Sequence, residues 1–237
     1  MAGPSPQTGP HAAWVRRLGF VAVLFAPASA QAGAWITADE GRSITTAGYR
    51  QDGDVRGYET DVYVEEPLGD RFAVVGRAYY ATDNLGSETN EADAGLKARL
   101  WRDGRTALAA QIGPTWRSAP PPGCAQNGGE SRALAGRSGR GGRSFVNLEV
   151  AYRYNPGCSH VRYEATYGHR TGSRWLWLAQ VFADDDLRFG ETIKAQATMV
   201  RFSKAGRGLQ LSARIQLDGA EVIEPTLIVG YWSGARR

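Results

Sequence analysis

The sequence lacks a concentration of charge of one sign, and it lacks long apolar runs outside its first 32 positions. Its 237 residues carry 28 Lys and Arg against 24 Asp and Glu, a formal net charge of +4. A nucleic-acid-binding protein needs a concentrated basic face, which this balance does not indicate, so no nucleic acid is expected as a partner. The missing apolar runs exclude a bundle of membrane helices.

Residues 1–32 have the order of a secretory signal peptide. Arg16 and Arg17 precede the apolar stretch 18–26 (LGFVAVLFA), and small residues follow up to Ala30 and Ala32. The stretch is shorter than the roughly 20 apolar residues of a membrane-spanning helix, although a retained membrane anchor is the alternative. Cleavage after Ala30 or Ala32 would remove both arginines and no acid, leaving 26 basic (28 − 2) against 24 acidic residues, a net charge of +2. The mature domain is then expected to comprise residues 33–237.

Beyond residue 33 the dominant pattern is period-two alternation, which is typical of β-strands. In 91–101 (EADAGLKARLW), charged residues occupy one face, and alanine and leucine occupy the other. The segment 208–217 (GLQLSARIQL) repeats this arrangement, as do 147–154 and 161–170. The sequence therefore predicts an all-β protein whose strands each have one apolar and one charged face.

Turn residues divide the chain into twelve predicted strands. These are 42–51, 58–66, 71–82, 91–101, 105–116, 130–137, 144–154, 161–170, 174–183, 191–203, 208–217 and 225–232. The connections at 67–70, 102–105, 138–143, 171–173 and 204–207 are short. Those at 52–57, 83–90, 118–129, 155–160, 184–190 and 218–224 are mostly longer. An even strand number with alternating short and long connections is typical of transmembrane β-barrels.

Two interpretations of the alternation compete. In a soluble sandwich or lipocalin-like barrel the apolar faces point inward, whereas in an outer-membrane barrel they meet lipid and the polar faces line a lumen. Aromatic residues favour the membrane barrel, because Tyr80, Trp116, Tyr152, Tyr154 and Tyr163 lie near the long connections, and Phe72, Trp175 and Tyr231 lie near the short ones. Two aromatic girdles around an apolar band suit a bilayer with two interfaces. We therefore expect a single antiparallel transmembrane β-barrel of about 12 strands.

Several segments carry a resemblance to known proteins. They are 33–37 (GAWIT), 65–80 (EEPLGDRFAVVGRAYY), 145–154 (FVNLEVAYRY), 174–182 (RWLWLAQVF) and 230–232 (GYW). Together they resemble an uncharacterised family of porin-like outer-membrane β-barrel proteins of Gram-negative bacteria. The resemblance covers most of the mature chain and implies an outer-membrane location, with membrane lipid and the barrel-assembly machinery as partners. It departs at 233–237 (SGARR), since such barrels usually end on an aromatic residue.

The two cysteines, Cys124 and Cys158, fall in the third and fourth predicted long connections of an exported chain. Oxidation is the default in that compartment, so a disulfide between them is expected, with two free thiols as the alternative.

The polar faces define a predicted lumen of mixed charge. Its lining residues are Arg50, Asp61, Glu65, Arg77, Glu91, Asp93, Lys97, Arg99, Gln111, Arg117, Glu149, Arg153, Arg162, Glu164, Lys194 and Arg214. Side chains nearly fill barrels of about eight strands, and wide aqueous pores occur at about 16 strands or more. Two roles follow from the mixed charges: a structural network of ion pairs, or a narrow pore for a small solute.

Other chemistry has little support. A lipid hydrolase would need a nucleophile with a base, yet Ser159 and His160 are adjacent in sequence and would point apart, His169 lies on an apolar face, and no Gly-x-Ser-x-Gly motif is present. The acidic run 184–186 offers oxygen ligands for Ca²⁺, but such runs usually only solvate a loop. We predict no catalytic residue, metal or cofactor. A lipid-modifying barrel enzyme and a soluble exported barrel that binds a ligand remain as alternatives.

Overall fold

The computed structural model of the protein describes residues 34, 36, 41–186, 190–218 and 221–234. The predicted signal peptide, 1–32, lies outside the described residues. The strands are β1 (Arg42–Asp52), β2 (Val55–Pro67), β3 (Phe72–Asp83), β4 (Glu88–Arg102), β5 (Thr106–Arg117), β6 (Asn127–Ser138), β7 (Ser144–Asn155), β8 (Cys158–Thr171), β9 (Trp175–Asp186), β10 (Gly190–Phe202), β11 (Gly208–Asp218) and β12 (Glu221–Ser233).

Among the described residues, no helix is long and apolar enough to cross a membrane.

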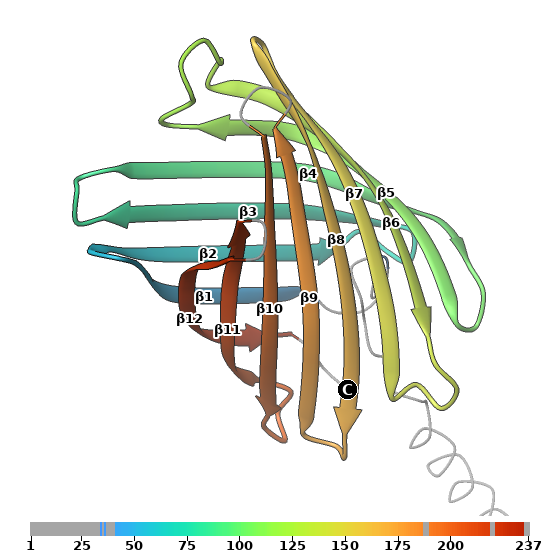
Figure 1. Cartoon of the computed structure of the whole chain (residues 1–237). Helices are drawn as coiled ribbons and strands as arrows, with labels where there is room; N and C mark the ends of the chain where they lie inside the picture. The colour runs from blue at the N-terminus through green and yellow to red at the C-terminus, as the bar shows by residue number, and fades with distance from the viewer. Residues whose placement is uncertain (1–33, 35, 37–40, 187–189, 219–220, 235–237) are drawn as a thin grey trace, which may run out of the picture.

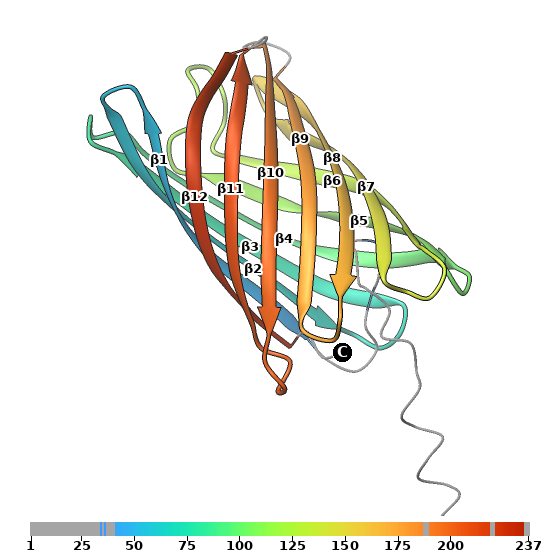
Figure 2. The same ribbon diagram turned by 60° about the horizontal axis from the view of Figure 1, so that its bottom comes forward.

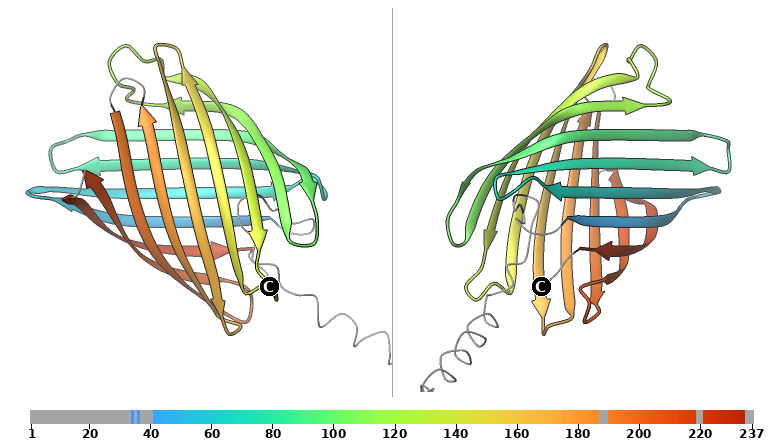
Figure 3. Two further views of the ribbon diagram at one scale, coloured as in Figure 1. Left: turned by 45° about the vertical axis from the view of Figure 1, so that its right-hand side comes forward. Right: turned by 180° about the vertical axis from the view of Figure 1, so that it is seen from behind.

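The twelve strands form one closed antiparallel barrel. Each strand pairs with its neighbours in sequence, and β12 closes the ring on β1, in the register Ser43↔Ser233 to Arg50↔Thr226. Figure 1 shows β7 to β10 running nearly upright in front of β1 to β5, which run across the view, so two walls of the barrel cross. The turned views in Figures 2 and 3 show the same continuous wall of strands from other sides. The predicted fold class, a twelve-stranded transmembrane-type barrel, is confirmed.

The barrel has two ends, which are distinguished by the strand connections that they carry. We call the end with the β2–β3, β4–β5, β6–β7, β8–β9 and β10–β11 connections the turn end, and the opposite end the loop end. The start of β1 and the finish of β12 both lie at the turn end. The even strand number requires this placement.

The predicted alternation of short and long connections is wrong. The β1–β2 and β7–β8 connections contain only residues 53–54 and 156–157, because the strands continue through most of the segments that we expected to be loops. Gly53 and Gly157 have φ values of +56° and +89°, which let the chain reverse tightly where a side chain would be strained. Of the connections at the loop end whose residues are all described, only 118–126 is long.

The outer surface carries the apolar halves of the alternating strands. Leu100, Ile112 and Leu209 are each about two-thirds exposed, and many other Val, Leu and Tyr side chains are exposed in the same way. Exposed aromatics lie at both ends, for example Tyr152 and Tyr154 at the loop end and Phe72 and Trp101 at the turn end. An apolar band between two aromatic girdles matches a bilayer and its two interfaces.

Candidate functional site

The candidate site is the interior of the barrel. Ion pairs between strands that are not neighbours, such as Arg214 on β11 with Glu59 on β2, can form only across the interior. Strand alternation then places every second residue inside. By this register the sixteen residues expected to line the lumen lie on the inner face, namely Arg50, Asp61, Glu65, Arg77, Glu91, Asp93, Lys97, Arg99, Gln111, Arg117, Glu149, Arg153, Arg162, Glu164, Lys194 and Arg214.

Arg153 is the centre of a charged network on the wall formed by β4 to β7. Its guanidinium donates to Glu130 at 2.8 Å and to Glu91 at 3.1 Å, and it lies 3.6 Å from Asp93. Arg132 joins the network, pairing with Glu130 and, at 2.6 Å, with Glu149. Arg153 and Glu130 are buried, so their counter-charges come from the ion pairs of this network and not from water.

Further ion pairs tie other strands together. The Nε and Nη2 atoms of Arg77 donate hydrogen bonds to the Asp61 carboxylate, at 3.0 and 2.7 Å. Arg214 donates to both oxygens of Glu59, at 2.7 and 2.6 Å. These bonds are charge-assisted and geometrically specific, so they fix the approach of the strands that carry them.

Glu164 and Lys194 differ from the other charged lumen residues in having no ion pair with any described residue. Glu164 accepts hydrogen bonds from Thr166 and Gln180 instead.

An uncharged series of hydrogen-bonded side chains, the polar ladder, crosses the inner wall from β9 to β12. Gln196 donates to Gln180 at 3.2 Å and to Thr198 at 3.0 Å, and Thr198 donates to Ser212 at 2.9 Å. The ladder continues through Gln210, which accepts a hydrogen bond from the indole of Trp232 at 2.6 Å. Amides and hydroxyls therefore line the middle of this wall, and the charged Lys194 and Arg214 lie nearer its loop end.

Glu65 forms a buried cluster nearer the turn end. One of its oxygens accepts hydrogen bonds from the Tyr63 hydroxyl at 2.5 Å, Arg42 at 2.8 Å and Lys97 at 3.0 Å. Lys97 is 1% exposed and Glu65 is 2% exposed. A single buried carboxylate thus contacts two cations, so the cluster keeps one positive charge in excess.

The interior beside the turns is apolar, which the sequence analysis did not predict. The cluster comprises Ala34, Ala107, Ala109, Leu134, Phe145, Leu176, Val200 and Phe202, with Leu178 and Trp232 packed against it. These residues lie close to the turn ends of β5, β6, β7, β9, β10 and β12. The expectation of a wholly polar inner face is wrong here, because the cluster packs against itself and needs no water.

Ala34 reaches this cluster from the segment that precedes β1. Its backbone N–H donates to the Asn147 side chain on β7 at 3.2 Å, and both Ala34 and Ile36 are buried. In the ring of twelve strands, β7 lies six strands from β1 in either direction. Residues near the predicted mature start therefore contact the wall opposite β1, inside the turn end.

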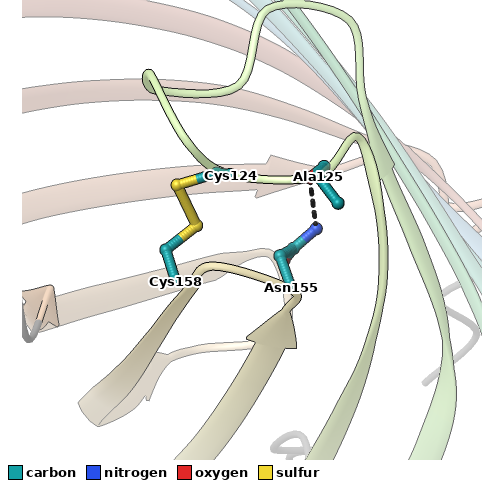
Figure 4. Close-up of a disulfide and its surroundings, with 4 residues drawn as sticks. All are labelled: Cys124, Ala125, Asn155 and Cys158. Atoms are coloured by element: carbon teal, nitrogen blue, oxygen red, sulfur yellow. Dashed lines mark hydrogen bonds between the residues drawn. A yellow bond between two sulfur atoms is a disulfide. The ribbon is translucent and has the colours of Figure 1, made fainter.

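The predicted disulfide between Cys124 and Cys158 is present, with the two Cα atoms 5.4 Å apart (Figure 4). It joins the β5–β6 connection to the start of β8, so the expected position of Cys158 within a loop is wrong. Beside it, the Asn155 amide donates to the Ala125 carbonyl at 3.1 Å. The bridge therefore anchors the long connection at the loop end.

His160 and the acidic run also lie in strands, and not in loops as predicted. His160 pairs with Arg153 in the β7–β8 ladder and faces inward, whereas the Ser159 hydroxyl contacts the outward Tyr152 hydroxyl. Ser159 and His160 thus point apart, as expected. Asp184 on β9 pairs with Arg162 at 3.5 Å. The residues that the structure describes contain no group of three or more His, Cys, Asp or Glu side chains able to hold a metal.

Several interior charges are absent from the predicted set of lumen residues. Arg42, Glu59, Glu130 and Arg132 take part in the ion pairs above, and Asp184 was assigned to a loop. The first four lie within predicted strands, where the period-two alternation places them on the inner face, and Asp184 requires the strand 174–183 to continue to residue 186.

Comparisons with known proteins support the geometry. No family model and no curated protein sequence matches the chain. Among solved structures, the KdgM porin superposes with a TM-score of 0.60 at 7% identity, covering 80% of this chain and 97% of that one. The chain has the fold of an outer-membrane porin. The NanC porin gives a TM-score of 0.61 at 9% identity, covering 80% of this chain and 98% of its own.

A third structure is an outer membrane channel from Pseudomonas putida F1. It gives a TM-score of 0.59 at 13% identity and covers 85% of this chain and 98% of its own. At such low identities the likeness extends to the fold alone.

Proposed function

We propose that the protein is a non-enzymatic barrel of the Gram-negative outer membrane that acts as a narrow channel for a small polar solute. Its apolar belt and aromatic girdles supply the lipid contact, and its interior supplies a polar path. The proposal includes removal of residues 1–32 as a signal peptide and insertion by the barrel-assembly machinery, with membrane lipid as the surrounding partner. The opposite orientations of Ser159 and His160 favour a role without catalysis.

The observation that carries the proposal is the polar inner wall combined with the apolar layer at the turn end. Water and small solutes can follow the polar ladder on β9 to β12, where Gln180, Gln196 and Ser212 offer hydrogen bonds. The layer around Ala34 then closes the path. We infer that the contact of Ala34 with Asn147 holds the channel shut at its turn end.

The charges of the interior bear on the solute. The KdgM porin has also been solved in complex with disordered oligogalacturonate. In this chain most interior arginines are already paired with carboxylates, for example Arg153 and Arg214. We therefore propose a small solute, with little preference between anions and cations, and not an acidic polymer.

Planar-bilayer recording of the purified barrel tests the channel. The natural protein should show small, rare conductance steps. Asn147→Ala removes the acceptor for Ala34, and Ile36→Asp places a charge where the side chain is buried, so both should produce larger or more frequent steps. Leu148→Ala, an exposed outward neighbour of Asn147, is the matched control and should leave conductance unchanged.

Heat-modifiable gel mobility in an outer-membrane fraction must accompany the recording, because it shows that each variant folds. If folded natural protein and folded variants all lack any conductance step, the channel is refuted, and a structural role in the envelope takes its place.

A further inference from the structure

Exposed cations gather at the turn end of the barrel. They are Arg71, Arg102, Arg105, Arg137, Arg140, Arg143, Arg174, Arg201, Lys204 and Arg207, which we call the basic collar. All five connections of the turn end, or the strand residues beside them, contribute. The exposed carboxylates described at this end are Glu66, Asp70 and Asp103, so ten cations face three acids, an excess of seven.

Two of these three carboxylates are already engaged. Asp70 pairs with Arg99 at 3.1 Å, and Asp103 accepts hydrogen bonds from the backbone N–H groups of Arg105 and Thr106. Asp70 is thus shared with Arg99, which lies outside the collar, whereas Asp103 keeps its negative charge beside Arg105, and the excess of seven cations already counts both acids.

The loop end has the opposite charge. Its exposed charged side chains among the described residues are Asp52, Asp54, Arg56, Glu88 and Glu191, four acids against one cation. With a predicted mature net charge of only +2, the collar reflects segregation of charge along the barrel axis. A segregated potential at one end selects a partner by charge, which an evenly mixed surface does not.

Aromatic residues fix the depth of the collar relative to a membrane. Arg71 precedes Phe72, Arg102 follows Trp101, and Arg174 precedes Trp175. The Arg201 guanidinium also lies 5.4 Å from the centre of the Trp175 ring. Girdle aromatics sit at the level of lipid headgroups, so cations next to them in the turns lie at the level of the phosphates.

We propose that the basic collar binds the phosphates of anionic phospholipids, of the phosphatidylglycerol type, in the leaflet beside the turn end. A guanidinium donates two parallel hydrogen bonds to a phosphate, and nine of the ten collar residues are arginines. The proposal rests on placement of the barrel in a membrane, but it does not depend on whether the lumen conducts.

Spin-labelled lipids test the collar in the full-length mature barrel, reconstituted into phosphatidylcholine vesicles. The measurement is the relative affinity of the barrel surface for spin-labelled phosphatidylglycerol over phosphatidylcholine. At low salt we expect a preference of about fivefold, which is about 1 kcal/mol. At 1 M salt the preference should fall toward one, because the Debye length shrinks to about 3 Å.

Variants locate the effect. The quadruple variant Arg71→Gln, Arg102→Gln, Arg174→Gln and Arg201→Gln should lose most of the preference. Two single variants form a matched pair. Arg174→Gln should weaken the preference for phosphatidylglycerol, and Arg56→Gln, at the loop end, should leave that preference unchanged. Heat-modifiable gel mobility establishes that each variant is folded.

Three outcomes overturn the collar's role: equal affinity of the natural protein for both lipids, a folded quadruple variant that keeps the preference, or a loss in Arg56→Gln as large as that in Arg174→Gln. Soluble polyphosphate provides a further arm. If it binds the collar in phosphatidylcholine vesicles while no lipid preference is seen, the partner is a soluble polyanion and the lipid proposal fails.

Discussion

Replacement of Glu65 by Gln should destabilise the barrel more than replacement of its partner Lys97. Glu65 is the only carboxylate that contacts both Lys97 and Arg42, at 3.0 and 2.8 Å, among the described residues. Glu65→Gln keeps the size of the side chain but leaves two cations beside each other without a counter-charge. Removing one partner of a buried ion pair typically costs about 3 to 5 kcal/mol.

Lys97→Met is the milder change. Glu65 then keeps its hydrogen bonds from Arg42 and Tyr63, so the loss is one hydrogen bond to a charged group, about 1.5 to 3 kcal/mol. The free energies of unfolding of the two variants should therefore differ by about 2 kcal/mol, roughly a 30-fold difference in the folded-to-unfolded ratio. Glu66→Gln, on the exposed neighbour, should change stability by less than about 0.5 kcal/mol.

Urea titration of vesicle-reconstituted protein measures these differences, followed by tryptophan fluorescence and by gel mobility in both the unfolding and the refolding directions. The reasoning is refuted if Lys97→Met is as destabilising as Glu65→Gln, or if neither variant differs from Glu66→Gln.

Three further predictions concern the connections and one close strand contact. Reduction of the Cys124–Cys158 bridge, which spans 34 residues, should lower the free energy of unfolding by roughly 3 to 4 kcal/mol in urea titrations with and without reductant, and Cys124→Ser should make stability insensitive to reductant. In the β4–β5 connection, hydrogen bonds from two backbone N–H groups lower the pKa of Asp103 below its ordinary 3.8, so this carboxylate stabilises the fold above that pH, and the contribution disappears as the pH falls through the lower folded value. Asp103→Asn should remove this dependence of the free energy of unfolding on pH in urea titrations at acidic pH. An unchanged pH dependence would count against the hydrogen bonds. Gly113→Ala would place a Cβ 1.8 Å from the Ala94 carbonyl oxygen, so β4 and β5 must separate, and stability in urea should fall by about 2 kcal/mol or more.

Much of the fold could be predicted from alternation. Each predicted strand matches an observed one with ends within four residues, as in 144–154 against Ser144–Asn155 for β7. The ends differ most at the loop end, where Gly and Asp residues suggested loops. There the strands continue as paired ladders, so His160 and Asp184 lie in the wall. Turn residues mark where a chain can reverse, and they do not show how far its hydrogen-bond ladder continues.

The inward-facing residues were directly predictable only where the two faces of a strand differ in polarity. Arg153 and Glu149 stand out beside the exposed Val150 and Tyr152, so their inward position could be inferred. Near the turns both faces are apolar, so the inward position of Phe145 follows only from extending the alternation of Asn147 and Glu149.

The sequence by itself determined the number of strands, the face on which most charges lie and the two girdles, because side-chain alternation is a local property with a period of two residues. The tertiary structure alone decided which charges meet. Arg214 donates a hydrogen bond to Glu59, from which it is separated by 155 positions in the sequence. Ala34 donates to Asn147, which is 113 positions away and lies on the wall opposite β1. Such partners depend on the stagger and closure of all twelve strands together, since a contact across the interior is set by the geometry of the whole ring and not by any one strand.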